Sequence, residues 1–152
     1  MALQRNINLS IIKVLEELKN KPEDPKLYYK LGNLYKRKGE TDKSIEQYQK
    51  ALSIQPTFVR ALNSLAIASA MKGRYNKSLF FLKKSIECEP DSADAYYYIA
   101  SIYARRKEEK KSIEWLNQAV QRGYNNWDRI KTDSNLENIR SSSEYEMLIK
   151  DH

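Results

Sequence analysis

Few residues in this chain could act together in catalysis or in metal binding. Among 152 residues there is one histidine, His152, and one cysteine, Cys88, which excludes a histidine-based triad and any site with several such ligands. Four glycines leave no glycine-rich phosphate-binding loop. An acidic cluster lacks the spacing of a calcium loop and is better interpreted as a solvated turn: Glu87, Glu89, Asp91 and Asp94. We therefore expect no catalytic residue, no metal and no cofactor.

The composition is that of an ordered protein with an excess of positive charge. Hydrophobic residues make up 41% of the chain and charged residues 31%, which excludes a disordered polymer. The net charge of +7 suggests an acidic partner, but it is spread in short runs such as Lys36-Arg37-Lys38, typical of solvated helix ends. No apolar run has membrane length and no signal-peptide core is evident, so we expect no membrane insertion and a cytoplasmic location. The mature part of an exported protein would have the same composition.

The elements that organise the chain recur at a step of 34 residues. Each copy contains two amphipathic helical stretches, and neither can bury its apolar stripe alone. Such a repeat predicts an α-solenoid, in which neighbouring copies cover one another. The repeated columns are Pro22, Pro56 and Pro90; Leu31, Leu65 and Ile99; Gly39 and Gly73; and Ser10, Ser44, Ser78 and Ser112.

Local signals predict where several helices begin and end. Asp24 before Pro25 is typical of a capped helix start, and Gly39 is typical of a helix end. Two further starts are predicted from capping boxes, formed by Asp91 with Asp94 and by Ser141 with Glu144.

The motif Tyr28-x-x-Leu31-Gly32-x-x-Tyr35, followed by Ser44, Tyr48, Ala51 and Pro56, resembles the tetratricopeptide repeat. The resemblance extends over residues 23–124, with departures at Ser69, Lys107 and Tyr124. It implies an all-α fold, a right-handed α-solenoid of three helix pairs. A half-repeat helix would precede the pairs and a short helical cap would follow them.

This organisation predicts three parts. Residues 1–22 are expected to form the N-terminal capping helix, with residues 1 to about 7 frayed. Residues 23–124 are expected to hold the three repeats, 23–56, 57–90 and 91–124. Beyond Gly123 the pattern breaks, and residues 125–152 are predicted to fold over the last repeat as two or three short helical pieces.

The resemblance also implies a concave groove lined by the first helix of each repeat. Helical geometry separates this stripe from the core stripe of Leu27, Leu31 and Leu34. Three tyrosines of the groove, Tyr29, Tyr97 and Tyr98, are expected to be exposed as anchors. The predicted groove residues are Lys26, Tyr29, Lys30, Asn33, Arg37, Arg60, Asn63, Ser64, Ile67, Asp94, Tyr97, Tyr98 and Ser101.

We predict a non-enzymatic protein-interaction module that holds a peptide or helical segment of a partner, with lysines and arginines favouring acidic residues in it. The family's carboxylate clamp for chaperone termini is absent, because Asn33 alone agrees and Asp94 would repel a carboxylate. One alternative is a self-assembling adaptor in which Trp127 and Tyr145 of the cap dock on another copy. A less favoured alternative, which depends on net charge alone, is association with nucleic acid.

Overall fold

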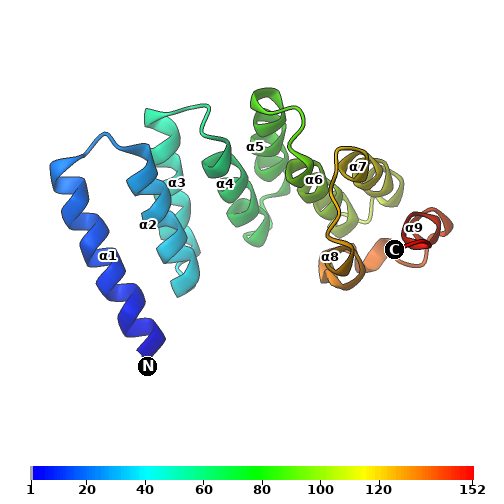
Figure 1. Ribbon diagram of the computed structural model, residues 1–152, viewed down its shortest axis with the longest axis horizontal. Coiled ribbons are helices and arrows are strands. Elements are labelled where there is room, and N and C mark those ends of the chain that lie inside the picture. Colours follow the sequence, from blue (N-terminus) through cyan, green and yellow to red (C-terminus); the bar gives the residue numbers. More distant parts are fainter. Residues whose placement is uncertain (1) are drawn as a thin grey trace. The chain divides into compact units, whose positions relative to one another are not determined.

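The computed structural model describes residues 2–152, with side chains from Gln4 onward, and every regular element in that range is helical (Figure 1). The predicted all-α repeat architecture is confirmed. The chain divides into two compact units, Met1–Phe81 and Leu82–His152, which are described separately. The elements are α1 (Ala2–Asn20), α2 (Pro25–Lys38), α3 (Thr41–Ile54), α4 (Val59–Met71), α5 (Tyr75–Cys88), α6 (Ala93–Arg105), α7 (Glu109–Gln121), α8 (Trp127–Thr132), η1 (Ser134–Ile139) and α9 (Ser143–Ile149).

In the N-terminal unit, α1 packs along α2 over most of its length. Ile7, Ile11 and Val14 of α1 form a core cluster with the buried leucines of α2. The predicted fraying of the first seven residues is wrong for the described part, because α1 begins at Ala2 and Ile7 is only 3% exposed. Ile7 continues the stripe at the i, i+4, i+7 spacing, so its burial stabilises an additional turn of helix.

The predicted boundaries of α2 are confirmed by their backbone geometry. The Asp24 side chain accepts a hydrogen bond from the backbone N–H of Lys26, and Pro25 occupies the first helical position. Gly39 ends the helix with φ at 82°, in the left-handed region that a residue without Cβ adopts at low cost.

The helix pair α2–α3 approaches closely because Gly32 faces a tyrosine. A Cβ atom added at Gly32 would lie 2.5 Å from Cε1 of Tyr48, inside van der Waals contact. The Tyr48 ring itself is fully buried. Glycine at this column therefore leaves the space that the largest core side chain of α3 occupies.

The repeated serines act as hydrogen-bond donors as well as small residues. Ser78 Oγ donates to the carbonyl of Ala66 at 2.7 Å, and Ser112 Oγ donates to the carbonyl of Ala100 at 2.8 Å. Each bond joins the two helices of a pair, α4 with α5 and α6 with α7. Ser44 differs, since its hydroxyl donates to the carbonyl of Thr41 within its own helix.

The C-terminal unit surrounds a core to which the end of the chain contributes. Ile130, Leu136, Ile139 and Tyr145 of α8, η1 and α9 are buried against residues of α6 and α7. The predicted cap of short helical pieces is therefore confirmed. The corner between α6 and α7 is closed by Lys107, a non-glycine residue with φ at 60°.

Both predicted capping boxes are wrong in their residues. Helix α6 begins after Ser92, and no side chain caps it. Helix α9 is capped by Ser142, whose Oγ accepts a hydrogen bond from the backbone N–H of Tyr145, one residue later than Ser141 with Glu144 would require. Ser142 is buried by its neighbours, which selects it over the exposed Ser141.

Candidate protein-binding surface

The predicted groove residues of α2 form one stripe along that helix, separate from the stripe of its buried leucines. Lys26, Lys30 and Arg37 are exposed, whereas Tyr29 and Asn33 are half-buried. The spacing i, i+3, i+4, i+7 places these side chains on one stripe. The three cations of this stripe are therefore open to solvent, and Tyr29 and Asn33 are only partly so.

A buried hydroxyl fixes the orientation of the Asn33 amide. Tyr48 of α3 donates a hydrogen bond to Asn33 Oδ1 at 2.8 Å. Burial raises the pKa of Tyr48 to about 12, while the Ser64 hydroxyl acts in the opposite direction. Because its oxygen is engaged, the Asn33 side chain presents its NH₂ group as a donor.

Helix α4 supplies the second row of predicted residues in the N-terminal unit. Arg60 is exposed, and Asn63, Ser64 and Ile67 are half-buried. The Oδ1 atom of Asn63 is shielded from solvent and has no hydrogen-bond partner among the described residues. Such an atom is an acceptor that a bound N–H group could satisfy.

Tyr29 is both a structural and a surface residue. Its ring lies 5.1 Å from the ring of Phe58 and 6.0 Å from the ring of Tyr48, centroid to centroid, in tilted arrangements. These contacts restrict the ring while leaving it half-exposed. A restricted aromatic side chain binds with a small loss of conformational entropy.

Positive charge is concentrated in the N-terminal unit. Residues 1–81 contain 15 lysines and arginines against 7 aspartates and glutamates, whereas residues 82–152 contain 12 against 13. The nine predicted groove residues of this unit include four cations and no anion. Lys30 lies 3.8 Å from a carboxylate oxygen of Glu17, a long and exposed ion pair that neutralises it only weakly.

In the C-terminal unit the expected exposure of the groove residues is only partly present. Asp94 is exposed and Tyr98 is half-buried, but Tyr97 is 0% exposed and Ser101 is 7% exposed. The expected surface role of Tyr97 is therefore wrong, and Ser101 is also covered. Ser101 Oγ donates to the carbonyl of Tyr97 within α6.

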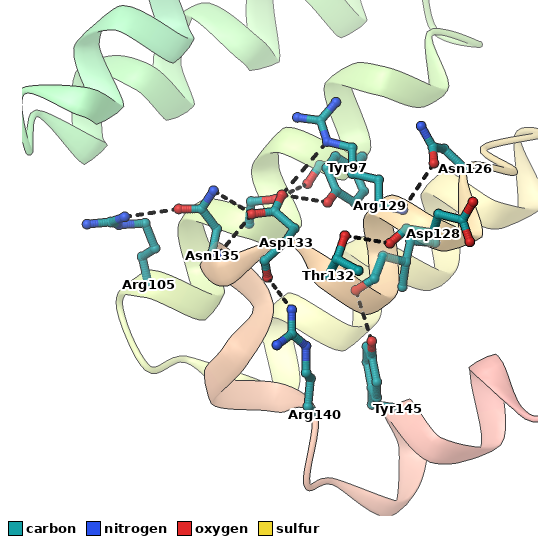
Figure 2. Close-up of polar contacts among 12 residues, drawn as sticks. Tyr97, Arg105, Asn126, Asp128, Arg129, Thr132, Asp133, Asn135, Arg140 and Tyr145 are labelled. Atoms are coloured by element: carbon teal, nitrogen blue, oxygen red, sulfur yellow. Dashed lines mark hydrogen bonds and ion pairs between the residues drawn. The ribbon is translucent and has the colours of Figure 1, made fainter.

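Tyr97 is buried by residues that follow the last repeat. Its ring stacks on Tyr124 with centroids 4.3 Å apart. Its hydroxyl donates to Asp133 Oδ2 at 2.7 Å (Figure 2). Burial, followed by this contact with the carboxylate, raises the pKa of Tyr97. The same carboxylate also accepts the backbone N–H and the side-chain Nδ2 of Asn135.

Arg129 is a residue of this region that the sequence reasoning missed. Its guanidinium carbon lies 4.8 Å from the ring centroid of Tyr97 and 5.3 Å from that of Tyr98, and Nε lies 3.8 Å from Asp133 Oδ2 (Figure 2). The 34-residue repeat contains a signal for this pair. Arg129 falls in the repeat position held by the buried residues Leu27, Ala61 and Ala95. Asp133, four residues later and of opposite charge, falls in the position held by Leu31, Leu65 and Ile99.

Of the two cap residues named for self-assembly, Tyr145 is buried and Trp127 is only partly covered. Tyr145 is 2% exposed, and its hydroxyl donates to the carbonyl of Ile130 at 2.9 Å. Trp127 is half-buried and stacks on His152 at a centroid distance of 3.7 Å. Tyr145 is thus part of the core, and its expected role in docking on another copy is wrong.

The described residues offer neither a metal centre nor a membrane segment. No group of three or more histidine, cysteine, aspartate or glutamate side chains in residues 2–152 is arranged to hold a metal ion. Over the same range, every helix is too short or too polar to cross a bilayer.

The fold and this surface define a helical-repeat protein whose first helices carry polar and aromatic side chains. One model of the tetratricopeptide repeat matches residues 25–58, and a second matches residues 47–80 and 81–114. The matches together extend over more than half of the chain, which therefore belongs to the tetratricopeptide repeat family. Membership supports the general role of a protein-interaction scaffold.

Similar proteins extend this assignment in sequence and in structure. The TPR repeat-containing thioredoxin TTL4 of Arabidopsis thaliana is 29% identical over 87 residues, 57% of this chain and 13% of that protein. The protein O-mannosyl-transferase TMTC1 of Homo sapiens is 26% identical over 93 residues, 59% of this chain. The matched part is only 10% of its length, so the chain corresponds to a minor part of either relative.

Among solved structures, the chain is similar to a crystal structure of MamA protein, with a TM-score of 0.76 and 21% identity over 99% of this chain and 79% of that one. A second structure, MamA 41-end from Desulfovibrio magneticus RS-1, gives a TM-score of 0.77 at 19% identity, over 99% of this chain and 89% of that one. Likeness at these identities shows the fold.

Proposed function

We propose that the N-terminal unit binds an extended acidic segment of a partner protein, and that the chain acts as a non-enzymatic interaction module. The observation that carries the proposal is the stripe on α2 and α4 that combines four cations with two asparagine amides. We call the set Lys26, Tyr29, Lys30, Asn33, Arg37, Arg60, Asn63, Ser64 and Ile67 the cationic stripe.

The two amides suit the main chain of an extended segment. The Asn33 NH₂ group would donate to a peptide carbonyl, because Tyr48 already engages the amide oxygen. Asn63 Oδ1 would accept a peptide N–H, which would satisfy an atom that lacks a partner among the described residues. An extended backbone exposes both kinds of group at regular intervals.

The cations would select acidic side chains in that segment. Exposed lysines and arginines contribute little individually, but several acting on one ligand raise both its association rate and its specificity. Tyr29 would add apolar contact area, since its ring is held by Phe58 and Tyr48 and is half-exposed.

The test is the affinity of the full chain for short fluorescent peptides in which alanine alternates with glutamate or with lysine, measured by anisotropy. A stripe variant, Lys26→Ala, Arg37→Ala and Arg60→Ala, is compared with a matched variant, Lys13→Ala, Lys50→Ala and Lys77→Ala. Both variants remove three exposed cations from the same unit.

We expect the glutamate peptide to bind to the unmodified chain. The affinity should be about tenfold lower for the stripe variant and should change less than twofold for the matched variant. Equal weakening by both variants would mean that net charge alone drives binding. A single-stranded oligonucleotide serves as the comparison ligand. If it binds more tightly than the peptide, with a steep dependence on salt and equal sensitivity to both variants, association with nucleic acid replaces the peptide proposal.

A further inference from the structure

The C-terminal unit contains a polar pocket of about 310 Å³ that the proposed function does not use. It lies between the start of α6, the turn that follows α7, and one side chain of α8. Asp94, Asn125 and Asn126 of its lining are exposed, and Arg129 is half-buried. The lining residues are Ser92, Ala93, Asp94, Gly123, Tyr124, Asn125, Asn126 and Arg129.

Arg129 is held in place before any ligand binds. The rings of Tyr97 and Tyr98 of α6 lie against its guanidinium. Oδ2 of Asp133 lies 3.8 Å from its Nε (Figure 2). The Asn126 side chain accepts the backbone N–H of Arg129 at 3.0 Å, which fixes the start of α8. A guanidinium so restrained donates hydrogen bonds with little loss of side-chain entropy.

Tyr124 provides an independent indication of a ligand. The residue is only 7% exposed, and its hydroxyl is shielded from solvent without a hydrogen-bond partner among the described residues. Burial raises the pKa of Tyr124, with the charge of Arg129 acting against the rise and that of Asp94 adding to it. Tyr124 thus brings to the lining of the pocket a buried hydroxyl, on which the charges of Arg129 and Asp94 both act, and this hydroxyl can still donate one hydrogen bond.

The charges around the pocket favour a neutral ligand. Among the lining residues, Asp94 repels an anion and Arg129 repels a cation. A neutral group with a hydrogen-bond acceptor facing Arg129 and donors facing Asp94 can pair with both charges at once. A primary carboxamide has this arrangement.

We propose that this pocket binds the carboxamide of an asparagine or glutamine side chain in a partner protein. The carboxamide oxygen accepts hydrogen bonds from Arg129 and from the Tyr124 hydroxyl, and its NH₂ group donates to the Asp94 carboxylate. The site is separate from the cationic stripe and does not depend on it.

The test is a titration of the isotope-labelled full chain with N-acetyl-glutamine N-methylamide, followed by NMR. We expect saturable shifts in the backbone amides of residues 92–94 and 123–126 and in the Arg129 Nε–H signal. The corresponding glutamate and lysine derivatives, and free glutamine, serve as comparison ligands. Equal or tighter binding of either charged derivative overturns the proposal, and so does preference for free glutamine, which would indicate an amino-acid site.

Two variants separate binding from folding. Tyr124→Phe removes a hydroxyl that has no hydrogen-bond partner among the described residues, so it is expected to leave the unfolding midpoint unchanged and to lower the affinity for the ligand about three- to tenfold. Asp94→Asn is expected to weaken it about tenfold, whereas Asp91→Asn, an exposed carboxylate outside the pocket, leaves affinity unchanged. Unchanged affinity in both Tyr124→Phe and Asp94→Asn would refute the assignment of the donors and acceptor.

Discussion

Two buried tyrosines of the C-terminal unit differ in one hydrogen bond, and the same substitution at each is expected to have different consequences. The Tyr145 hydroxyl donates to the carbonyl of Ile130 at 2.9 Å, and neither residue is more than 2% exposed. The Tyr124 hydroxyl is also buried but has no partner among the described residues. Phenylalanine keeps the ring and removes the hydroxyl in both cases.

The magnitude follows from what each substitution leaves behind. Tyr145→Phe leaves the Ile130 carbonyl buried and unpaired, at a cost of about 1–3 kcal/mol in the free energy of unfolding. Tyr124→Phe removes a buried polar atom that already lacks a partner, so the free energy of unfolding is expected to stay within about 0.5 kcal/mol or to rise. The expected difference between the variants is therefore at least about 1 kcal/mol.

The assay is urea unfolding followed by tryptophan fluorescence. Both tryptophans, Trp115 and Trp127, belong to residues 82–152, so the signal reports on the C-terminal unit alone. For Tyr145→Phe we expect the midpoint to fall by about 0.5–3 M with an unchanged slope, given a slope of about 1–2 kcal/mol per molar. Equal losses in the two variants, or a larger loss for Tyr124→Phe, would refute the reasoning.

Three other predictions concern backbone, packing and pH. Gly32→Ala should lower the stability of the N-terminal unit, followed by circular dichroism, by about 1–3 kcal/mol because the new methyl group meets the Tyr48 ring; a gain of about 1 kcal/mol, the ordinary helix preference for alanine, would contradict it. Lys107→Gly should stabilise the C-terminal unit by about 0.5–1 kcal/mol in the fluorescence assay, because a φ of 60° strains a residue that has a Cβ atom. A loss of stability would show that the lysine side chain stabilises the fold by more than this backbone strain costs. The pKa of Tyr48 is about 12 in the folded chain against 10.0 ordinarily, so the unfolded chain releases this proton first. The contribution of Tyr48 to stability should therefore be constant below about pH 9 and fall as pH rises from about 10 towards 12. Tyr48→Phe should reduce that alkaline fall, and an identical alkaline pH dependence in both proteins would exclude Tyr48 as its source.

Much of the secondary structure could be read from local signals, because each depends on residues adjacent in the chain. The Asp24 cap and the Gly39 end needed only the preferences of short polar side chains and of glycine. The caps of α6 and α9 were less predictable, since several neighbouring serines and aspartates could serve. Ser142, which caps α9, is buried while Ser141 is exposed, and such a difference depends on tertiary packing.

The sequence by itself determined the repeat, the helix pairs and the face of each helix that carries polar residues, because a period of 3.6 residues within a 34-residue step is a one-dimensional property. It did not determine whether a face is open. Tyr29 and Tyr97 are both predicted groove residues, yet Tyr97 is covered by Tyr124, Arg129 and Asp133, whereas Tyr29 remains half-exposed. Only the tertiary structure decided this difference, since burial depends on which segment, remote in sequence, packs against a helix face.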